Sequence, residues 1–463
     1  MENKRLKSIH ITNYYHKNSG GISYAYDKLL EAANRHQRFV RLIVPGEYDE
    51  QEEIGEFGRI YYVATKNFPF FDQRYRVMQA WNTYIFDKTR IRQILLEEKP
   101  ELIEIAEKYS LTLLAGLIRK GYLKSLNRPL LVHFTCERMD DNMRSFVSGA
   151  PPFMWFARRV MGNYNFPMFD YHIANSTYTA QELFDSVLPE QNLHRSQAFF
   201  NFCWRYFHAA RTPIKERVFV NQCGVDSELF NINRKTAENR RALLAEAGFP
   251  ENATVLLYFG RISPEKNVKL LPELMNSLAS FAPWDAQRRE YRLLIAGDGP
   301  QTSALKQQLE LQAPGKYKFL GQVSDREKLA NICANSDIFV HPNPHEPFGI
   351  APLEAMASGI PLLAPNSGGV LSYANNQNAW LEVPRGEDFF AGVCDIVADK
   401  EKREAKIAKA LQTAHRYSWE ASTNRIFALY DEMLENFNRH RELYDYEIKP
   451  SEIDFADELL FNR

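Results

Sequence analysis

The 463-residue sequence lacks the features that mark membrane-spanning, nucleic-acid-binding and zinc-binding proteins. No run approaches the roughly 20 apolar residues that a membrane-spanning helix needs. The formal net charge is −1 at pH 7, so no overall positive field attracts nucleic acid or an anionic membrane. Its five cysteines are scattered and form no CxxC pair, which favours reduced thiols in a cytoplasmic chain. The N-terminal stretch has no long apolar run after its lysines, so it predicts a first strand rather than a signal peptide.

Several nucleotide-binding signatures are missing as well. The sequence contains no GxxxxGK[ST] motif, so ATP or GTP hydrolysis has little support. The stretch IAGDGP has two of the glycines of a dinucleotide fingerprint but not the full GxGxxG pattern. No DxD pair occurs in the glycine-rich or acidic loops, which weakens the case for a metal-bridged diphosphate. We therefore expect neither a metal ion nor a bound cofactor.

What the sequence does contain is a regular alternation of strand and helix patterns. The hydrophobic content of 45% and charged content of 25% are typical of a globular protein, and the length predicts two domains. Buried-strand patterns include SIHITN, RFVRLIVPG, PLLVHFT and FDYHIANS, and a second series runs from TVLLYFG to AWLEVP. This alternation predicts an α/β protein with two doubly wound Rossmann-like domains that face each other across a cleft.

The two series set the domain boundaries. We expect a first domain over residues 1–225 and a second domain over residues 226–435, because a GVD loop and a polar helix separate the two patterns. Residues 436–463 form a polar tail. The last helix either stays with the second domain or crosses back and packs on the first, and the sequence leaves both arrangements open.

The stretch HPNPHEPFGIAPLEAMASGIPLLAP predicts a strand end, a tight turn, a helix and a further strand. Its two carboxylates, Glu346 and Glu354, are eight residues apart and flank the expected helix N-terminus. That N-terminus is a natural anion site, with backbone N–H groups from Phe348, Gly349 and Ile350. In the alternative reading, Glu354 only complements the helix dipole and Glu346 is a solvated loop acid.

A second candidate anion site follows the first strand of the second series. In GRISPEKN, residues 260–267, Arg261 and Lys266 can both reach an anion at the strand end. A diphosphate is the guest that fits this pair, although basic residues in surface loops are often only solvated. At the first strand-to-helix turn, Gly20 and Gly21 either allow close approach of a phosphate or sugar or form a plain tight turn.

Together, GRISPEKN, LLIAGDGP, the run from LGQVSDREKL to IFVHP, and EPFGIAPLEAMASGIPLLAPNSGG resemble the retaining glycosyltransferases of family 4 in order and spacing. These enzymes have two domains in the GT-B fold. The match covers most of residues 254–370, with weaker matches at SGGIS, IANSTYTA, GVDSELFN and YSWE.

The resemblance implies a role for each matched position. Arg261 and Lys266 would bind the diphosphate of a nucleotide sugar, Glu346 would contact the transferred sugar, and Glu354 would hydrogen-bond the ribose hydroxyls. Further donor contacts are implied for the backbone at Phe348, Gly349 and Ile350, the base-side loop at Gln322 and Val323, and Gly21 of the facing domain.

The acceptor side follows the resemblance less closely. LLVHFTCERMDDN is similar to a Ser-His-Glu-Arg-Leu-Asp segment of bacterial mannosyltransferases, whose histidine stands near the reacting sugar. Here Cys136 replaces that histidine. His133, three residues earlier, substitutes for it only if the strand end bends, and in the alternative interpretation it is a core residue.

Two aromatic stretches with interleaved arginines occur in the first domain, at residues 151–162 and 196–211. Packing in the core or between helices is the favoured interpretation. The alternatives are docking at a membrane interface or on a lipid acceptor, or stacking on an acceptor sugar.

The sequence thus predicts a retaining, metal-independent glycosyltransferase that moves a sugar from a UDP- or GDP-sugar to the hydroxyl of a carbohydrate or lipid-linked acceptor. Its catalytic candidates are Glu346, His133 and Cys136. Two alternatives are a nucleotide-sugar 2-epimerase on the same architecture and a catalytically silent binding subunit. We expect a cytoplasmic location, with peripheral contact at the inner face of the membrane as an alternative, and no nucleic-acid partner.

Overall fold

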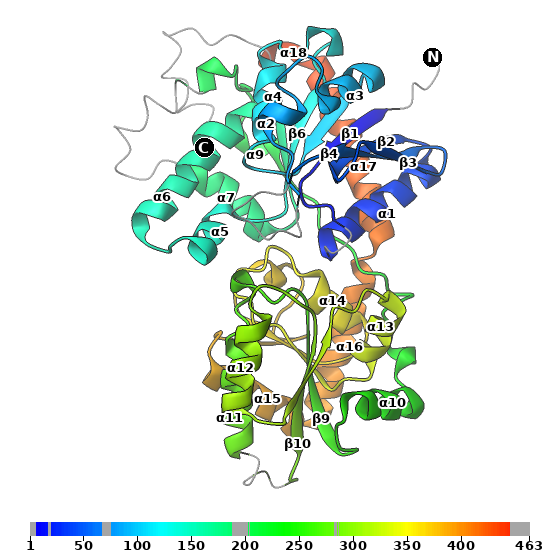
Figure 1. The fold of residues 1–463 in the computed structure, drawn as a ribbon, viewed down its shortest axis with the longest axis vertical. Helices are drawn as coiled ribbons and strands as arrows, with labels where there is room; N and C mark the ends of the chain where they lie inside the picture. Colours follow the sequence, from blue (N-terminus) through cyan, green and yellow to red (C-terminus); the bar gives the residue numbers. More distant parts are fainter. Residues whose placement is uncertain are drawn as a thin grey trace. The chain divides into compact units, whose positions relative to one another are not determined.

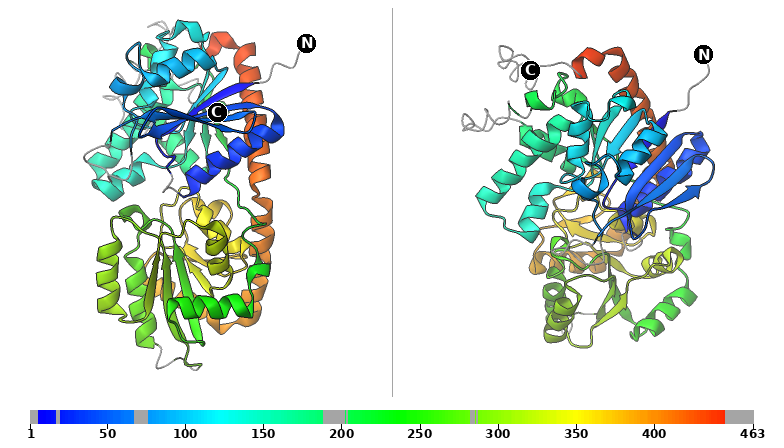
Figure 2. Two further views of the ribbon diagram at one scale, coloured as in Figure 1. Left: turned by 45° about the vertical axis from the view of Figure 1, so that its right-hand side comes forward. Right: turned by 45° about the horizontal axis from the view of Figure 1, so that its top comes forward.

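The computed structural model describes residues 6–16, 20–66, 76–187, 202, 204–281, 285 and 287–444. The chain divides into two compact units (Figures 1 and 2). The first takes in Met1–Gln222 and Ser422–Arg463, and the second is Cys223–Ala421. Each is built on a parallel sheet with helices packed against it, so the prediction of two Rossmann-like α/β domains is confirmed.

The sheet of the first unit has eight strands in the order β3-β4-β2-β1-β5-β6-β7-β8. Every neighbouring pair is parallel except β3 and β4. Its strands are β1 (Lys7–Ile11), β2 (Phe39–Gly46), β3 (Glu50–Ile54), β4 (Gly58–Ala64), β5 (Leu102–Ile105), β6 (Leu130–Thr135), β7 (Tyr171–Ala174) and β8 (Val218–Val220). Its helices are α1 (Gly21–His36), α2 (Ala80–Thr83), α3 (Arg90–Glu98), α4 (Thr112–Arg119), α5 (Met139–Phe146), α6 (Pro151–Val160), α7 (Thr177–Val187), α9 (Ile214–Arg217) and α18 (Arg441–Tyr444).

Both faces of this sheet are buried, which explains why its strands are almost continuously apolar. Successive side chains on a strand point to opposite faces. Leu102 of β5 therefore belongs to the core cluster formed with α1, and the next residue, Ile103, belongs to the cluster formed with α3 and α4. Leu130 and Leu131 of β6 divide between the same two clusters.

Strand β3 is the element that the sequence patterns do not reveal. Its sequence, EQEEI, has four exposed polar residues and one half-buried isoleucine, so it carries no apolar alternation. It pairs antiparallel with β4 at the edge of the sheet, from Glu50 opposite Tyr62 to Ile54 opposite Gly58. Charged side chains on an edge strand also discourage pairing with another chain.

The sheet of the second unit has six strands, all parallel, in the order β11-β10-β9-β12-β13-β14. They are β9 (Ala253–Phe259), β10 (Glu290–Ala296), β11 (Tyr317–Gly321), β12 (Ile338–Val340), β13 (Leu362–Pro365) and β14 (Trp380–Glu382). The helices of this unit are α10 (Ala237–Ala247), α11 (Leu270–Phe281), α12 (Thr302–Gln312), α13 (Arg326–Ala334), α14 (Ile350–Ala357), α15 (Gly386–Ala398) and α16 (Lys400–Arg416).

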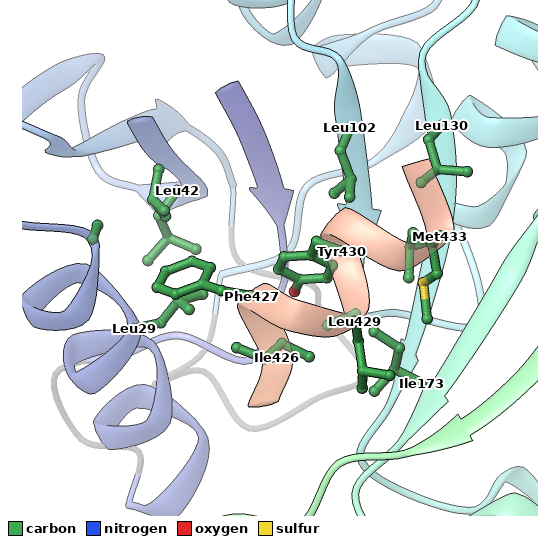
Figure 3. Close-up of a cluster of buried hydrophobic side chains, with 14 of the residues drawn as sticks. Leu29, Leu42, Leu102, Leu130, Ile173, Ile426, Phe427, Leu429, Tyr430 and Met433 are labelled. Carbon is green, nitrogen blue, oxygen red and sulfur yellow. The ribbon is translucent and has the colours of Figure 1, made fainter. Parts of the chain in front are cut away.

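Helix α17 (Trp419–Arg439) carries the chain back into the first unit. Figure 3 shows its apolar side chains among those of α1 and the first sheet. Residues Ile426, Phe427, Leu429, Tyr430, Met433 and Phe437 are all buried in this cluster. The sequence patterns end the second domain at residue 435 and leave the packing of the last helix open, whereas the compact units divide at 421/422, because these apolar residues already fill the first core. The predicted tail beyond Tyr444 lies outside the described residues.

The aromatic stretch at residues 151–162 is only partly packed. Ala157 and Met161 are buried in a small cluster with α5 and α7, so the packing interpretation holds for them. It is wrong for Phe153, Trp155 and Phe156, whose side chains are exposed. In the second stretch, residues 196–201 and 203 lie outside the described residues.

We predict that Met433→Ala destabilises the first unit by about 2–5 kcal/mol, because the substitution removes fully buried methylene groups and leaves a cavity. Urea unfolding followed by circular dichroism measures the change. Glu432→Ala, at an exposed position of the same helix, is the matched control. Equal midpoints for the two variants would show that α17 does not support this core.

Candidate functional site

The phosphate-site residues predicted from the sequence follow two neighbouring strands of the second sheet. Arg261 and Lys266 come after β9, and Glu346 comes after β12. These strands are adjacent and parallel, and the strand order reverses between them. Loops at the carboxyl ends of such a switch point diverge and leave room for a ligand. The topology therefore brings together residues 80 positions apart.

Lys266 and Glu346 form the central contact of this site. The ammonium Nζ of Lys266 donates to Oε1 of Glu346 at 3.1 Å and to Oε2 at 2.8 Å. The side-chain amide of Asn343 donates to Oε2 at 3.0 Å. The imidazole Nε2 of His341 lies 3.8 Å from the same oxygen. The carboxylate is thus held by three side chains, two of which precede it on its own loop.

Burial and charge set the ionisation of this group. Burial raises the pKa of Glu346, but the positive charge of Lys266 outweighs it and holds the pKa at about 2, below the ordinary 4.5. Burial lowers the pKa of Lys266, and Glu346 reverses that effect, so the net direction is upward. Burial lowers the pKa of His341 to about 4. At neutral pH the site holds an ion pair beside an uncharged imidazole.

The loop after β12 ends at the N-terminus of α14. Gly349 is the N-cap and has φ of +89°, in the left-handed region that glycine adopts without strain. A Cβ at this position would lie 2.9 Å from the hydroxyl of Tyr373 and 3.1 Å from Cγ of Glu346. Within the described residues no side chain caps this helix, so the N–H groups of its first turn point toward the loop. Phe348 is buried against Tyr373 and Tyr417, and Ile350 is the first helical residue.

The loop after β13 comes very close to the backbone of the loop that carries Glu346. The backbone N–H of Gly369 donates to the backbone oxygen of Glu346 at 2.6 Å. A Cβ at Gly369 would lie 1.9 Å from the backbone oxygen of Pro347, so only glycine fits there. The second glycine of NSGG therefore fixes the position of the catalytic candidate.

Glu354 has a partner that the sequence patterns did not identify. Nη2 of Arg326 donates to Oε1 of Glu354 at 2.5 Å. Glu354 is buried; burial raises its pKa, Arg326 opposes this, and the net direction is upward. Arg326 is the first residue of α13, four residues after the predicted base-side loop. An arginine at the start of the helix after the predicted base-side loop is the signal that could have revealed the ion pair with Glu354.

The remaining donor-side candidates lie in a loop and at a helix start. Val323 is half-buried and Gln322 is exposed, both in the loop that follows β11. Gly21 is the first residue of α1 in the first unit, and a Cβ at the preceding Gly20 would meet no atom within 4 Å. Gln322 and Val323 thus lie in a loop, and Gly21 lies at the start of a helix.

The catalytic candidates of the first unit are both buried. His133 is fully enclosed in β6, where its Nδ1 lies 3.1 Å from Nδ1 of His172 and its ring stacks on Phe169. Burial holds its pKa well below the ordinary value. This placement is that of the core residue, the alternative that the sequence left open. Cys136 is buried just after β6, and Asn175 donates to its backbone oxygen at 3.4 Å.

A polar cluster that the sequence patterns missed lies at the switch point of the first sheet, between β1 and β5. The hydroxyl of Tyr14, after β1, donates to Oε1 of Glu137 at 2.5 Å. Lys108, after β5, donates to Glu182 at 2.5 Å and to the backbone oxygen of Glu137. Burial raises the pKa of Glu107 to about 7. All but Glu182 directly follow a strand, and that position is the signal that could have identified them.

No group of three or more histidine, cysteine, aspartate or glutamate side chains is arranged for a metal ion in the part of the chain that the structure describes. The polar groups of the site are the ion pair, the amide, the imidazole and the helix N-terminus described above. Such a set can hold a diphosphate and a sugar next to each other.

Comparison with known proteins agrees with this architecture. Residues 239–413 match the family "Glycosyl transferases group 1". A GDP-mannose-dependent alpha-(1-6)-phosphatidylinositol dimannoside mannosyltransferase from Mycobacterium tuberculosis is 24% identical over 429 residues, which are 91% of this chain and 95% of that protein. The sulfoquinovosyl transferase SQD2 of Arabidopsis thaliana is 31% identical over 208 residues, 44% of this chain and 38% of that protein.

Among solved structures, the Anabaena protein Alr3699/HepE, in complex with UDP and glucose, superposes with a TM-score of 0.65 at 16% identity. The superposition covers 92% of this chain and all of that one. The fold is therefore that of the GT-B glycosyltransferases, as predicted. The chain is a glycosyltransferase of the hexosyltransferase class, and its matched region lies wholly within the second unit.

We predict that Glu346→Gln flattens the acid side of the stability profile. The folded-state pKa of Glu346 is depressed, so its stabilising effect is present above pH 4.5 and is lost as the pH falls toward 2. Between pH 7 and pH 3 the native chain should lose about 2 kcal/mol more than the variant does. Thermal unfolding across this range measures the difference. Glu251→Gln, at an exposed turn, is the control; parallel profiles for the native chain and Glu346→Gln would contradict the ion pair.

Proposed function

We propose that this protein is a retaining, metal-independent glycosyltransferase of family 4 that transfers a sugar from a UDP- or GDP-sugar to an acceptor hydroxyl. The observation that carries the proposal is the partly buried contact between Lys266 and Glu346 beside the N-terminus of α14. One partner suits a diphosphate and the other suits sugar hydroxyls, so a nucleotide sugar matches both.

The similar proteins support a donor of this class. The mycobacterial relative is named as GDP-mannose-dependent, and Alr3699/HepE was solved with UDP and glucose. Both kinds of donor carry the same diphosphate. The base is therefore the part of the donor that a binding experiment has to identify.

The donor's diphosphate would lie between Arg261, Lys266 and α14. Arg261 offers a planar fork of donors and Lys266 offers a compact charge. The first-turn N–H groups of α14 add donors directed at the same oxygens. Charge accumulates on the diphosphate as the sugar leaves, so these fixed donors stabilise the transition state more than the ground state.

The nucleoside would be held by Glu354 and the loop after β11. Arg326 donates to Oε1 of Glu354, which leaves Oε2 to accept ribose hydroxyls. Arg326 thereby orients Glu354 and opposes the effect of burial on its pKa, although the net direction stays upward. The loop with Gln322 and Val323 would border the base, and Gly21 would approach the phosphates.

In the transfer step, the acceptor oxygen bonds to the anomeric carbon on the face from which the diphosphate departs. The bond from the anomeric carbon to the β-phosphate oxygen breaks, and its electron pair remains on that oxygen. The acceptor proton passes to the leaving phosphate. Glu346 has a pKa of about 2, so it stays ionised and orients the sugar rather than taking this proton.

Acceptor recognition is proposed to lie in the first unit. Complete burial keeps His133 from direct contact with an acceptor, and Cys136 remains the candidate at the strand end. The nearby hydroxyl of Tyr14 and carboxylate of Glu137 form the polar contact at that end of the sheet. These groups suit the hydroxyls of a sugar.

We predict that one of the two nucleotides, UDP or GDP, raises the unfolding temperature and that ADP raises it less. A ligand at 100 times its dissociation constant stabilises the folded state by about 2.7 kcal/mol. A thermal-shift screen of the three nucleotides and their common sugars measures this, without and with a chelator. No shift with any nucleotide would overturn the donor site, and a shift that the chelator abolishes would overturn metal independence.

We predict that Lys266→Ala and Glu346→Ala each lower sugar transfer at least about 100-fold, because each removes a contact to the reacting part of the donor. Lys269→Ala, at an exposed position three residues along, is the matched control and should retain transfer. Release of nucleoside diphosphate is measured with each nucleotide sugar, alone and with glycoside and lipid-linked acceptors.

The same assay separates the alternatives. Release that accelerates with an acceptor supports a transferase, and the anomeric configuration of the product tests retention. Rapid release without an acceptor, together with an epimerised sugar, would support the 2-epimerase instead. Unchanged transfer in both site variants would show that the donor lies elsewhere.

A further inference from the structure

Exposed apolar side chains gather at one place in the first unit. Among the described residues, fifteen large apolar side chains are exposed, and five of them lie within residues 146–156. Their exposed fractions range from 41% to 62%. They are Phe146, Val147, Phe153, Trp155 and Phe156, and we call this group the aromatic patch. Clustering of this kind marks an interaction site, whereas scattered exposed apolar residues do not.

The patch is the outer side of a helix pair whose inner side is already packed. Figure 1 shows α5 and α6 beside each other at one edge of the first unit. Ala157 and Met161 of α6 are buried with Met139 of α5 and with α7. Pro152, Trp155, Phe156 and Arg159 repeat at the spacing of one helix face; the first three are exposed and Arg159 is half-buried. The aromatic rings are therefore not an unfinished part of the core.

The charged side chains within the segment that carries the patch are all arginines. Residues 142–169 include three arginines, Arg144, Arg158 and Arg159, and no aspartate or glutamate. The acids just before this segment, Asp140 and Asp141, are buried and form ion pairs with Arg138, and Asp141 also lies 4.0 Å from Arg144. The guanidinium of Arg159 lies over the ring of Trp155, at 5.5 Å from its centroid. A chain with a net charge of −1 thus presents a local surface that is both aromatic and basic.

We propose that the aromatic patch docks on the surface of a bilayer that contains anionic phospholipids. Aromatic rings partition to the boundary between headgroups and acyl chains, and arginines beside them contact lipid phosphates. Each basic side chain near such a surface strengthens binding about fivefold. The described residues include no helix long and apolar enough to cross a membrane, so this contact is with the interface.

This inference does not depend on the proposed donor or reaction. The patch lies on α5 and α6, and the donor site lies in the second unit. Vesicle binding is measured without any nucleotide sugar. Failure of one proposal therefore leaves the other testable.

The test is flotation of the full chain with vesicles of phosphatidylcholine alone, and with vesicles in which phosphatidylglycerol replaces about a third of it. The native chain should bind the second kind at least about tenfold better. The triple variant Phe153→Ser, Trp155→Ser, Phe156→Ser should lose about tenfold or more of that binding. Trp81→Ser, at another exposed tryptophan of the first unit, is the matched control and should bind as the native chain does.

Arg144→Gln combined with Arg159→Gln should weaken binding to anionic vesicles and leave the small affinity for neutral ones unchanged. Unfolding temperatures identify any variant that loses its fold. If the triple variant loses its fold, Trp155→Phe is used in its place, because this substitution keeps the fold. Vesicles should then induce a smaller blue shift in tryptophan emission than they do in the native chain. No binding by the native chain, equal binding to both vesicle types, or undiminished binding by the triple variant would overturn the proposal.

Discussion

Parallel pairing is the constraint on which the rest of this structure depends. It buries both faces of each sheet, and it gathers the loops that follow the strands at one edge. In the second unit, β9 and β12 are neighbours at the point where the strand order reverses. Lys266 and Glu346 meet there although 80 residues separate them. The polar cluster around Tyr14 and Glu137 has the same relation to its own sheet.

The contact between Lys266 and Glu346 also bears on the stability of the site. Burial disfavours each charge, but the attraction between the two outweighs that cost, because the pKa of Glu346 is lowered and that of Lys266 is raised. A ligand that presents a phosphate to Lys266 and hydroxyls to Glu346 would match both partners. Asn343 and the backbone of Gly369 keep the carboxylate in position before any ligand arrives.

Strands with long apolar runs could be predicted from the sequence, because burial dictates that pattern. The alternation of elements also gives the two-domain architecture. Strand β3 could not be predicted, since its pairing with β4 fixes an all-polar segment that has no pattern of its own. The division at 421/422 could not be predicted either, because the sequence of an amphipathic helix does not show against which core its apolar face packs.

The site divides in the same way. Arg261, Lys266, Glu346 and Glu354 stand in motifs whose spacing is visible along the chain. Arg326 becomes significant only through its contact with Glu354, which the packing of α13 and α14 produces. His133 shows the converse case, a reactive residue type at a promising place. It lies within β6, and because both faces of that sheet are covered, its side chain is enclosed.

Helix α17 has a consequence for the order in which the protein can be made. The ribosome releases the chain from its N-terminus, so residues up to 222 emerge first. Their sheet still lacks Phe427, Tyr430 and Met433, which belong to the same core. The second unit is complete once residue 421 has emerged. Translation therefore begins with the first unit but finishes its core last, and until then that half of the nascent chain exposes an apolar surface that a chaperone can bind.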